Sequence, residues 1–259
     1  MTDGADRALQ DEVIRALADG PYRASPAWRD RDLADPDRVE RYARFLARHF
    51  YYERIVQFFK YSRALARVTG RRPEAVLQSA EFGALFPTLV LGSRETAAAV
   101  ARLVTEYVSA GEPRVRYLPD LLRYETAMMV VEAGPRVWRD DAEARGAGHG
   151  ERYRPETVEG TVLLDLAFDL PAVLPNLLAP WTELPQAPAR PTRLLVARSP
   201  HGRVAVARSD EVVAAVVSLA DGRRTLAELA AGTGLDVGTL EGALRDLVDL
   251  GAVRFPTGS

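Results

Sequence analysis

The chain contains no cysteine, which excludes disulfide bonds, catalytic thiolates and zinc sites built on thiolate ligands. It has only three histidines, and no two of them share the short helical spacing typical of a metal site. His49 and Glu53 are the one exception in spacing, and we interpret them as a helix-surface pair or a core histidine. The sequence therefore predicts no metal site and no cofactor.

Long hydrophobic runs are also missing, since no apolar segment reaches the roughly 20 residues that a membrane-spanning helix needs. The first residues are acidic and lack the apolar core of a secretory signal. The glycine-rich motifs of dinucleotide and phosphate binding and the GxSxG motif of hydrolases are absent as well. We expect a cytoplasmic protein that is not an enzyme and has no membrane partner.

A strong charge of either sign is lacking too. The 34 basic and 36 acidic residues leave a net charge of −2, which gives no reason to expect a nucleic-acid partner. With 259 residues, 47% of them hydrophobic, the chain is long enough for one large or two modest domains with real cores.

The first part of the chain shows helical periodicity. Apolar residues recur at helical spacing near the N-terminus, and Asp35 precedes a long helical stretch that ends at Gly70. Ser93 is placed to cap an amphipathic helix over Glu95–Tyr107, and another helix follows from Pro119. These patterns predict an N-terminal helical bundle.

Turn chemistry then marks a boundary. The charged, glycine-rich segment Asp140–Gly150 is interpreted as a loop, and Thr161–Phe168 as a strand before a short helix capped by Asp169. The proline-rich stretch Leu184–Pro191 is expected to be an extended linker. We therefore predict a helical domain over residues 1–183 and a second domain over residues 184–259.

The second domain begins with two short apolar runs, Arg193–Arg198 and Arg203–Arg208, joined by the turn residues Ser199–Gly202. This arrangement predicts a β-hairpin. Ser209 is expected to cap a following helix, and Thr225 with Glu228 forms a capping-box pattern for the next.

A third helix is expected to follow Asp236 and to stop at Gly251, before a final short strand. A hairpin followed by three helices is typical of a winged-helix module. The fold class predicted for the whole chain is therefore mainly α with a small α+β part, in which a helical bundle precedes a winged-helix-like peptide-recognition domain.

The charges of the third helix argue against DNA. A DNA-reading helix needs cationic side chains for phosphates and base edges, whereas this one offers Arg245 against Glu241, Asp246 and Asp249. From Pro191 to Ser259, eight arginines balance eight carboxylates. The ligand indicated is a peptide or protein.

The expected peptide site is the open edge of the hairpin, where a peptide can add as a further strand. Strand alternation groups Val204 with Val206, and Arg203 with Ala205 and Ala207. A proline at Ala205 should impair binding if that N–H points to the open edge. The expected site comprises Arg203, Val204, Ala205, Val206 and Arg208, with Leu240 and Leu244 as a groove floor or as core and Arg245 as a partner for an acidic residue.

Aromatic residues are concentrated in one helical stretch, where eight of the twenty lie between Tyr42 and Tyr61. Adjacent aromatic residues on a helix point in different directions, so they cannot all lie in one core stripe. Two interpretations remain open, core packing and docking of a protein partner. The docking candidates are Tyr51, Tyr52 and Phe58.

Several segments carry a resemblance to a known family. Phe86–Leu89, the helix Glu95–Val108 and above all Tyr117–Glu125 resemble the helical domain of partner proteins of multinuclear non-heme iron oxidative enzymes. Leu219–Leu229 and Leu244–Gly251 resemble the peptide-recognition winged helix of the pyrroloquinoline quinone peptide chaperone.

The resemblance implies a non-catalytic role in the biosynthesis of ribosomally made, post-translationally modified peptides. A partner of this kind binds the leader of a precursor peptide and presents the core to a separate iron-dependent oxidase subunit. The alternative function is a winged-helix transcription regulator with an N-terminal helical sensor domain.

Overall fold

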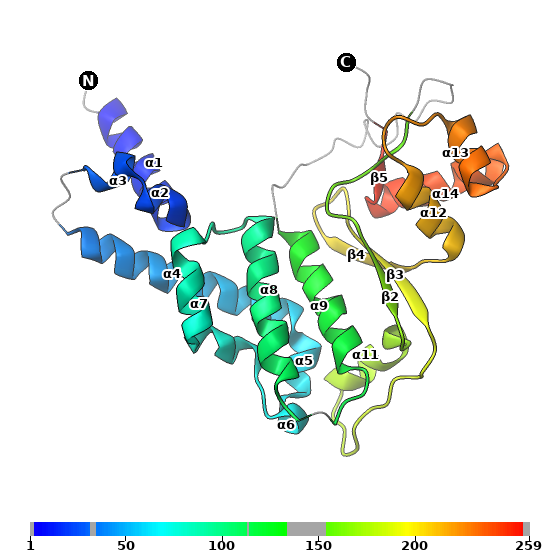
Figure 1. The fold of residues 1–259 in the computed structure, drawn as a ribbon, viewed down its shortest axis with the longest axis horizontal. Helices are drawn as coiled ribbons and strands as arrows, with labels where there is room; N and C mark the ends of the chain where they lie inside the picture. Colours follow the sequence, from blue (N-terminus) through cyan, green and yellow to red (C-terminus); the bar gives the residue numbers. More distant parts are fainter. Residues whose placement is uncertain (1–2, 32–34, 113, 134–153, 256–259) are drawn as a thin grey trace. The chain divides into compact units, whose positions relative to one another are not determined.

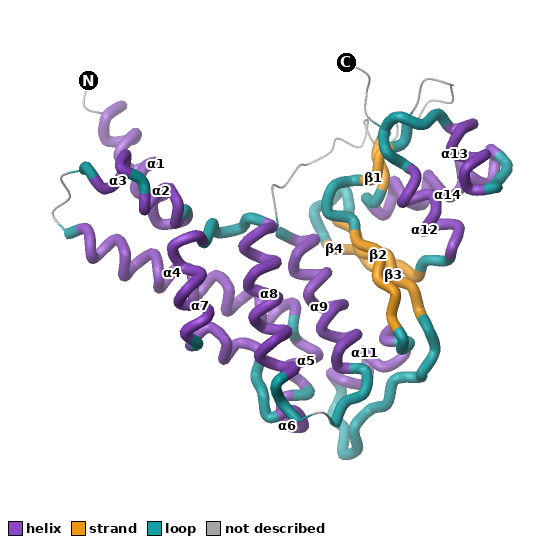
Figure 2. The backbone as a smooth tube through the Cα atoms, in the orientation of Figure 1, coloured by secondary structure: helices purple, strands orange, loops and turns teal. Residues whose placement is uncertain are grey.

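The computed structural model describes residues 3–31, 35–112, 114–133 and 154–255. The chain divides into two compact units, Met1–Met129 and Val130–Ser259. It is mainly helical with a small antiparallel sheet, as the sequence predicts (Figures 1 and 2). Among the described helices, none is both long enough and apolar enough to cross a membrane.

The first unit is built of helices. Its long helix α4 starts where Asp35 accepts a hydrogen bond from the backbone N–H of Arg38, and α8 starts where Ser93 accepts one from Thr96. The predicted cap of Ser93 is thereby confirmed, and the helix expected to follow Asp35 does begin there, with Asp35 as its cap. The α-helices are α1 (Asp3–Ala18), α2 (Gly20–Ala24), α3 (Pro26–Arg29), α4 (Pro36–Phe58), α5 (Lys60–Ala64), α6 (Ala66–Thr69), α7 (Ala80–Leu85), α8 (Arg94–Ser109) and α9 (Leu118–Glu132), with 3₁₀ turns at Pro73–Gln78 and Phe86–Thr88.

The core of the first unit uses one face of α4. Ala43, Ala47, Tyr51 and Ile55 recur every four residues along this helix, and all are at most 1% exposed. A hydrogen bond of 3.2 Å between the Thr105 and Thr126 hydroxyls joins α8 to α9, which lie side by side in Figure 1. The repeat of four residues selects one helical face, so the side chains on the opposite face of α4 are left in solvent.

A buried carboxylate holds the break between α4 and α5. The helix is interrupted at Phe59, whose φ and ψ are −97° and 32°. Glu125 of α9 accepts hydrogen bonds from the backbone N–H groups of Tyr61 (2.8 Å) and Ser62 (3.2 Å), and also from the Ser62 hydroxyl. Glu125 thus satisfies donors at the start of α5 that have no partner within the helix.

The second unit contains a three-stranded antiparallel sheet in the order β2–β3–β4, formed by Val162–Leu166, Thr192–Arg198 and Val204–Arg208. Val196 of β3 lies opposite Val162 on one side and Val206 on the other. The predicted hairpin is confirmed, and Gly202 takes a φ of 76° in its turn, a conformation that favours glycine.

Three helices follow the sheet: α12 (Glu211–Leu219), α13 (Leu226–Thr233) and α14 (Val237–Leu250). The capping box of Thr225 and Glu228 is confirmed, but the predicted cap of Ser209 is wrong. Asp210 is the cap of α12, because its carboxylate accepts the Val213 N–H at 2.8 Å, while the Ser209 N–H bonds to β3. The remaining elements are α11 (Leu170–Leu178) and a two-stranded sheet of β1 (Glu156–Thr157) with β5 (Val253–Arg254).

The structure divides the chain between residues 129 and 130, whereas the sequence suggested a boundary at residue 184. The reason is strand pairing, because β2 pairs with β3 along five residue pairs and β1 pairs with β5. The proline-rich Leu184–Pro191 therefore lies inside the second unit. The segment expected to be a loop, Asp140–Gly150, lies outside the described residues.

Candidate functional site

Strand β4 forms one margin of the three-stranded sheet. It pairs with β3 on one side, and no other strand among the described residues pairs with it on the opposite side. An edge strand of this kind presents backbone donors and acceptors that can pair with another chain. The structure therefore provides the open hairpin edge on which the predicted peptide site depends.

Two hydrogen bonds determine which groups of β4 face outward. The Ser199 N–H bonds to the Arg203 carbonyl at 2.7 Å, and the Ser209 N–H bonds to the Arg193 carbonyl at 2.9 Å. Hydrogen-bonded pairs alternate along an antiparallel ladder, so Ala205 and Ala207 direct their N–H groups to β3. The outward backbone groups belong to Val204, Val206 and Arg208. A proline at Ala205 would thus break the hairpin and would not test the open edge.

Side chains of β4 alternate between the two faces of the sheet. Ala205 and Ala207 lie opposite Ala197 and Leu195, which pack in the core formed with α12, α13 and α14. Val204 and Val206 are therefore on the other face, where both are half-buried. On the face of the sheet that packs against the helices, β4 carries only the small side chains of Ala205 and Ala207.

Arg208 at the end of β4 is held by a buried carboxylate. Asp169 is fully buried and accepts hydrogen bonds from the guanidinium groups of Arg208 (2.5 Å) and Arg190. The pKa of Asp169 is lowered below its usual value, chiefly by the hydrogen bond from Arg190 and also by the hydrogen bond from Arg208. Asp169 starts α11, as expected, but its side chain makes no cap there because both oxygens bind arginine. The side chain of Arg208 is thus held at the end of β4 by Asp169.

The helix α14 does not supply a groove floor. Leu240 and Leu244 are 0% and 1% exposed and belong to the core with Leu195 and Leu229. Of the two interpretations the sequence left open for these leucines, core packing is therefore correct. Arg245 lies on the exposed side of the same helix.

The predicted docking residues lie on different faces of α4, and only one of them is exposed. Tyr51 and Phe58 are 1% and 7% exposed, so the prediction that they dock a partner is wrong. Tyr51 packs edge-on against Phe82, with the ring centroids 6.4 Å apart, and burial raises the pKa of its hydroxyl. Tyr52 is 45% exposed, because successive residues on a helix point about 100° apart.

A row of exposed aromatic rings does exist on α4, and sequence reasoning missed most of it. Tyr42 and Phe45 are 53% and 60% exposed, and neither was among the docking candidates predicted from the sequence. The row, Tyr42, Phe45, His49 and Tyr52, follows the spacing of three, four and three residues that marks one helical face. The Phe45 ring lies 6.1 Å from both the Tyr42 and the His49 ring. This spacing was the signal that could have identified the row.

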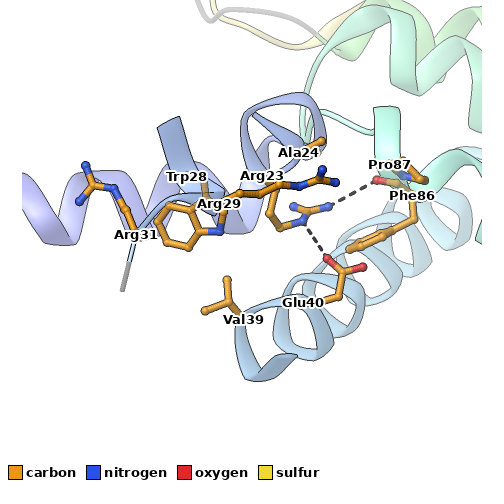
Figure 3. Close-up of a pocket in the computed structure, with 10 residues that line it drawn as sticks. Arg23, Ala24, Trp28, Arg29, Arg31, Val39, Glu40, Phe86 and Pro87 are labelled. Carbon is orange, nitrogen blue, oxygen red and sulfur yellow. Dashed lines mark hydrogen bonds and ion pairs between the residues drawn. The ribbon is translucent and has the colours of Figure 1, made fainter. Parts of the chain in front are cut away.

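A pocket of about 370 Å³ lies near the N-terminal end of α4 (Figure 3). Its buried Arg23 donates hydrogen bonds to Glu40 (3.2 Å) and to the carbonyls of Ala16 (2.7 Å) and Phe86 (3.4 Å). The guanidinium carbon also lies 4.3 Å from the Phe86 ring centroid. Because Arg23 already has a carboxylate and two carbonyls as partners, we interpret it as a structural residue whose hydrogen bonds connect α2 with α4 and the Phe86 segment.

Within the residues that the structure describes, no group of three or more histidine and acidic side chains is arranged to hold a metal ion. Comparison with known proteins adds no assignment, since neither a family model nor a curated protein matches the chain.

Proposed function

We propose that this chain is a non-catalytic partner protein that binds the leader of a ribosomally made precursor peptide. In this proposal the leader pairs with strand β4, and the chain presents the rest of the precursor to a separate iron-dependent peptide-modifying oxidase. The order of a three-stranded sheet followed by α12, α13 and α14 supports a winged-helix-like recognition unit.

The open edge of β4 is the observation that carries the proposal. Its outward backbone groups at Val204, Val206 and Arg208 offer alternate donors and acceptors to an incoming extended segment. In strand addition, these main-chain hydrogen bonds supply affinity, and the side chains of the added peptide supply specificity. The half-exposed Arg208 lies at one end of this edge, where it favours a leader with an acidic residue.

The alternative role as a transcription regulator is less well supported by the charges. On α14, Arg245, Asp246 and Asp249 are exposed, so carboxylates outnumber the single arginine there. Carboxylates repel the phosphate backbone that supplies most of the affinity for DNA. A gel-shift assay at low and moderate salt is the direct test, and salt-dependent binding of a DNA duplex would favour this alternative.

The test of the peptide role measures binding of a fluorescent leader peptide, taken from the precursor encoded nearest to this chain, by anisotropy. Val206→Pro removes an outward N–H from β4 and should weaken binding roughly tenfold or more. Val206→Ala, which keeps the N–H, is the matched control and should bind almost normally.

The opposite margin of the sheet supplies a second comparison. Ladder alternation directs the N–H of Asp165 in β2 away from β3, so Asp165→Pro removes an outward donor from the other edge. Normal binding by Val206→Pro together with loss in Asp165→Pro would move the site to β2. Lack of leader binding by the native chain would refute the peptide role itself.

A further inference from the structure

We propose that the exposed face of α4 binds an acidic protein surface, which the aromatic row of Tyr42, Phe45, His49 and Tyr52 contacts at its centre. The proposal rests on the proposed function, which names the partner as the iron-dependent oxidase. It replaces the docking site expected at Tyr51 and Phe58 with residues that are accessible.

The aromatic row has the character of an interface core. Ten residues separate Tyr42 from Tyr52, so the row extends about 15 Å along the helix. A fully buried aromatic side chain removes roughly 150–250 Å² from water, so three such chains about half exposed leave roughly 300 Å² of apolar area. Patches of this size on a single protein are often functional. A standard interface buries about 800 Å² per partner, so the row needs a surrounding rim.

Arginines provide that rim. Along the helix surface Arg41, Phe45, Arg48 and Tyr52 follow one another at spacings of four, three and four residues, which makes them neighbours. Arg48 is exposed and has no ion-pair partner among the described residues, whereas Arg41 lies 3.6 Å from Asp35. Tyrosine and arginine are the side chains most enriched at energetically dominant interface positions.

The charge of this face selects an acidic partner. Helix α4 carries five arginines against three carboxylates, although the chain as a whole has a net charge of −2. Ion pairs engage charges of both signs, since Glu40 pairs with Arg44 and Asp35 lies 3.6 Å from Arg41. Arg48, beside the aromatic row, has no ion-pair partner among the described residues, so positive charge remains next to the row. A surface with carboxylates around an apolar centre would complement this arrangement.

The same charge argues against a second copy of the chain as the occupant. In a two-fold symmetric interface the same patch meets itself. Arg48 lies next to the middle of the row, so a two-fold axis through that point would bring the two Arg48 side chains together. Like charges placed face to face disfavour association.

The experiment measures the affinity of the purified oxidase encoded nearest to this chain for the full-length protein by biolayer interferometry. The double variant Phe45→Ser with Tyr52→Ser should weaken binding roughly tenfold or more, and Arg48→Glu should do the same with reduced sensitivity to salt. The matched controls are Val237→Ser, at an exposed apolar residue of α14, and Arg116→Glu, at an exposed arginine that is not part of α4. Both should bind as the native chain does.

Leader binding by the same variants separates the two proposals. Leader binding should be unchanged in every α4 variant, because β4 belongs to the second unit. A far-ultraviolet circular dichroism spectrum and a melting temperature equal to those of the native chain show that α4 and the first unit remain folded in each variant. Native affinity of the α4 variants for the oxidase would overturn the docking surface and leave the peptide role standing. Absence of oxidase binding by the native chain would overturn the docking surface and the presentation step together, while leader binding alone would survive.

Two further outcomes would also overturn this proposal. One is a native dimer, seen by light scattering, that Phe45→Ser converts to a monomer. The other is binding of a single-stranded oligouridine at 150 mM salt that Arg48→Glu abolishes, because aromatic rings beside arginines can also stack bases.

Discussion

The Ser62 hydroxyl donates a hydrogen bond to the buried carboxylate of Glu125, although the two residues lie 63 positions apart in the sequence. Glu125 is fully buried and also receives the backbone N–H groups of Tyr61 and Ser62. Removal from water raises its pKa to about 8, more than the hydrogen bonds from Ser62 and Tyr61 lower it. A structural contact thereby becomes a source of pH dependence.

Glu125 should make the protein less stable as the pH rises from about 5 to 8. The folded-state pKa exceeds the unfolded value of 4.5, so the folded chain binds more protons in this range and loses that advantage as the pH approaches 8. The contribution of this group to the free energy of unfolding should fall by up to about 3 kcal/mol. Urea denaturation at pH 5.5 and pH 8 measures it. Glu125→Gln should flatten the profile, whereas Glu95→Gln, at an exposed residue, should leave it unchanged.

Asp169→Asn should destabilise the second unit by about 2 kcal/mol, because it leaves Arg190 and Arg208 without their shared buried carboxylate. The figure is below that for a wholly buried pair, since both arginine side chains are more than half exposed. Asp165→Asn is the control, because its ion pair with Arg193 lies at the surface and should contribute less than 1 kcal/mol. Equal losses in the two variants, measured by chemical denaturation, would contradict the role assigned to Asp169.

The pH dependence of Asp169 has the opposite sign to that of Glu125. Its pKa is lowered in the folded state, chiefly by Arg190, so the stability it contributes is present above the unfolded value of 3.8 and is lost as the pH falls. Native protein should therefore lose stability below about pH 4 more steeply than Asp169→Asn does. Parallel acid titrations followed by circular dichroism compare the two.

Gly251→Ala should cost more stability than Gly234→Ala, although both glycines end helices with a positive φ, of 85° and 71°. A Cβ at residue 251 would lie 2.1 Å from the Arg198 carbonyl oxygen, while one at residue 234 meets nothing within 4 Å. We expect a loss of about 1 kcal/mol at Gly234 and at least twice that at Gly251. Thermal denaturation of the two variants makes the comparison, and similar melting temperatures would contradict it.

Ala205→Pro should destabilise the hairpin, whereas Val206→Pro should leave it largely folded. The Ala205 N–H bonds within the ladder to β3, and the Val206 N–H points to the open edge. Loss of a ladder donor within a sheet is costly, while proline is tolerated at outward positions of edge strands. Hydrogen exchange of the β3 amides distinguishes the variants. Equal protection in both would contradict the assignment of the Ala205 N–H to β3 and of the Val206 N–H to the open edge.

Sequence reasoning correctly identified features that depend on neighbouring residues. Ser93 and the pair Thr225 and Glu228 cap their helices as predicted, and the helix expected after Asp35 begins there. A capping side chain reaches only two or three residues along its own chain, so its neighbours in the sequence suffice to recognise it. The hairpin of β3 and β4 could equally be predicted from the sequence, since its strands are joined by a short turn. Ser209 was the local error, where the adjacent Asp210 provided the cap.

The open edge of β4 was therefore largely predictable from the sequence, but the backbone groups that point outward from it were not. Which of Ala205 and Val206 points outward depends on the hydrogen bonds that Ser199 and Ser209 make across the hairpin. The exposed aromatic face of α4 was less visible, because three adjacent aromatic residues at positions 50–52 look alike in a sequence. Only packing against neighbours such as Phe82 buries Tyr51 and leaves Tyr52 in solvent.

The sequence by itself determined the longer helices, most of the caps predicted for them, the hairpin and the mainly helical class, because propensity, capping and periodicity act over a few residues. The tertiary structure alone decided the pairing of β2 with β3, the hydrogen bonds of Glu125 to the start of α5, and the ion pairs of Asp169 with Arg190 and Arg208. Those contacts join residues about twenty or more positions apart. Their selection depends on the free energy of burying apolar area and satisfying polar groups in one particular packing, which no local pattern encodes.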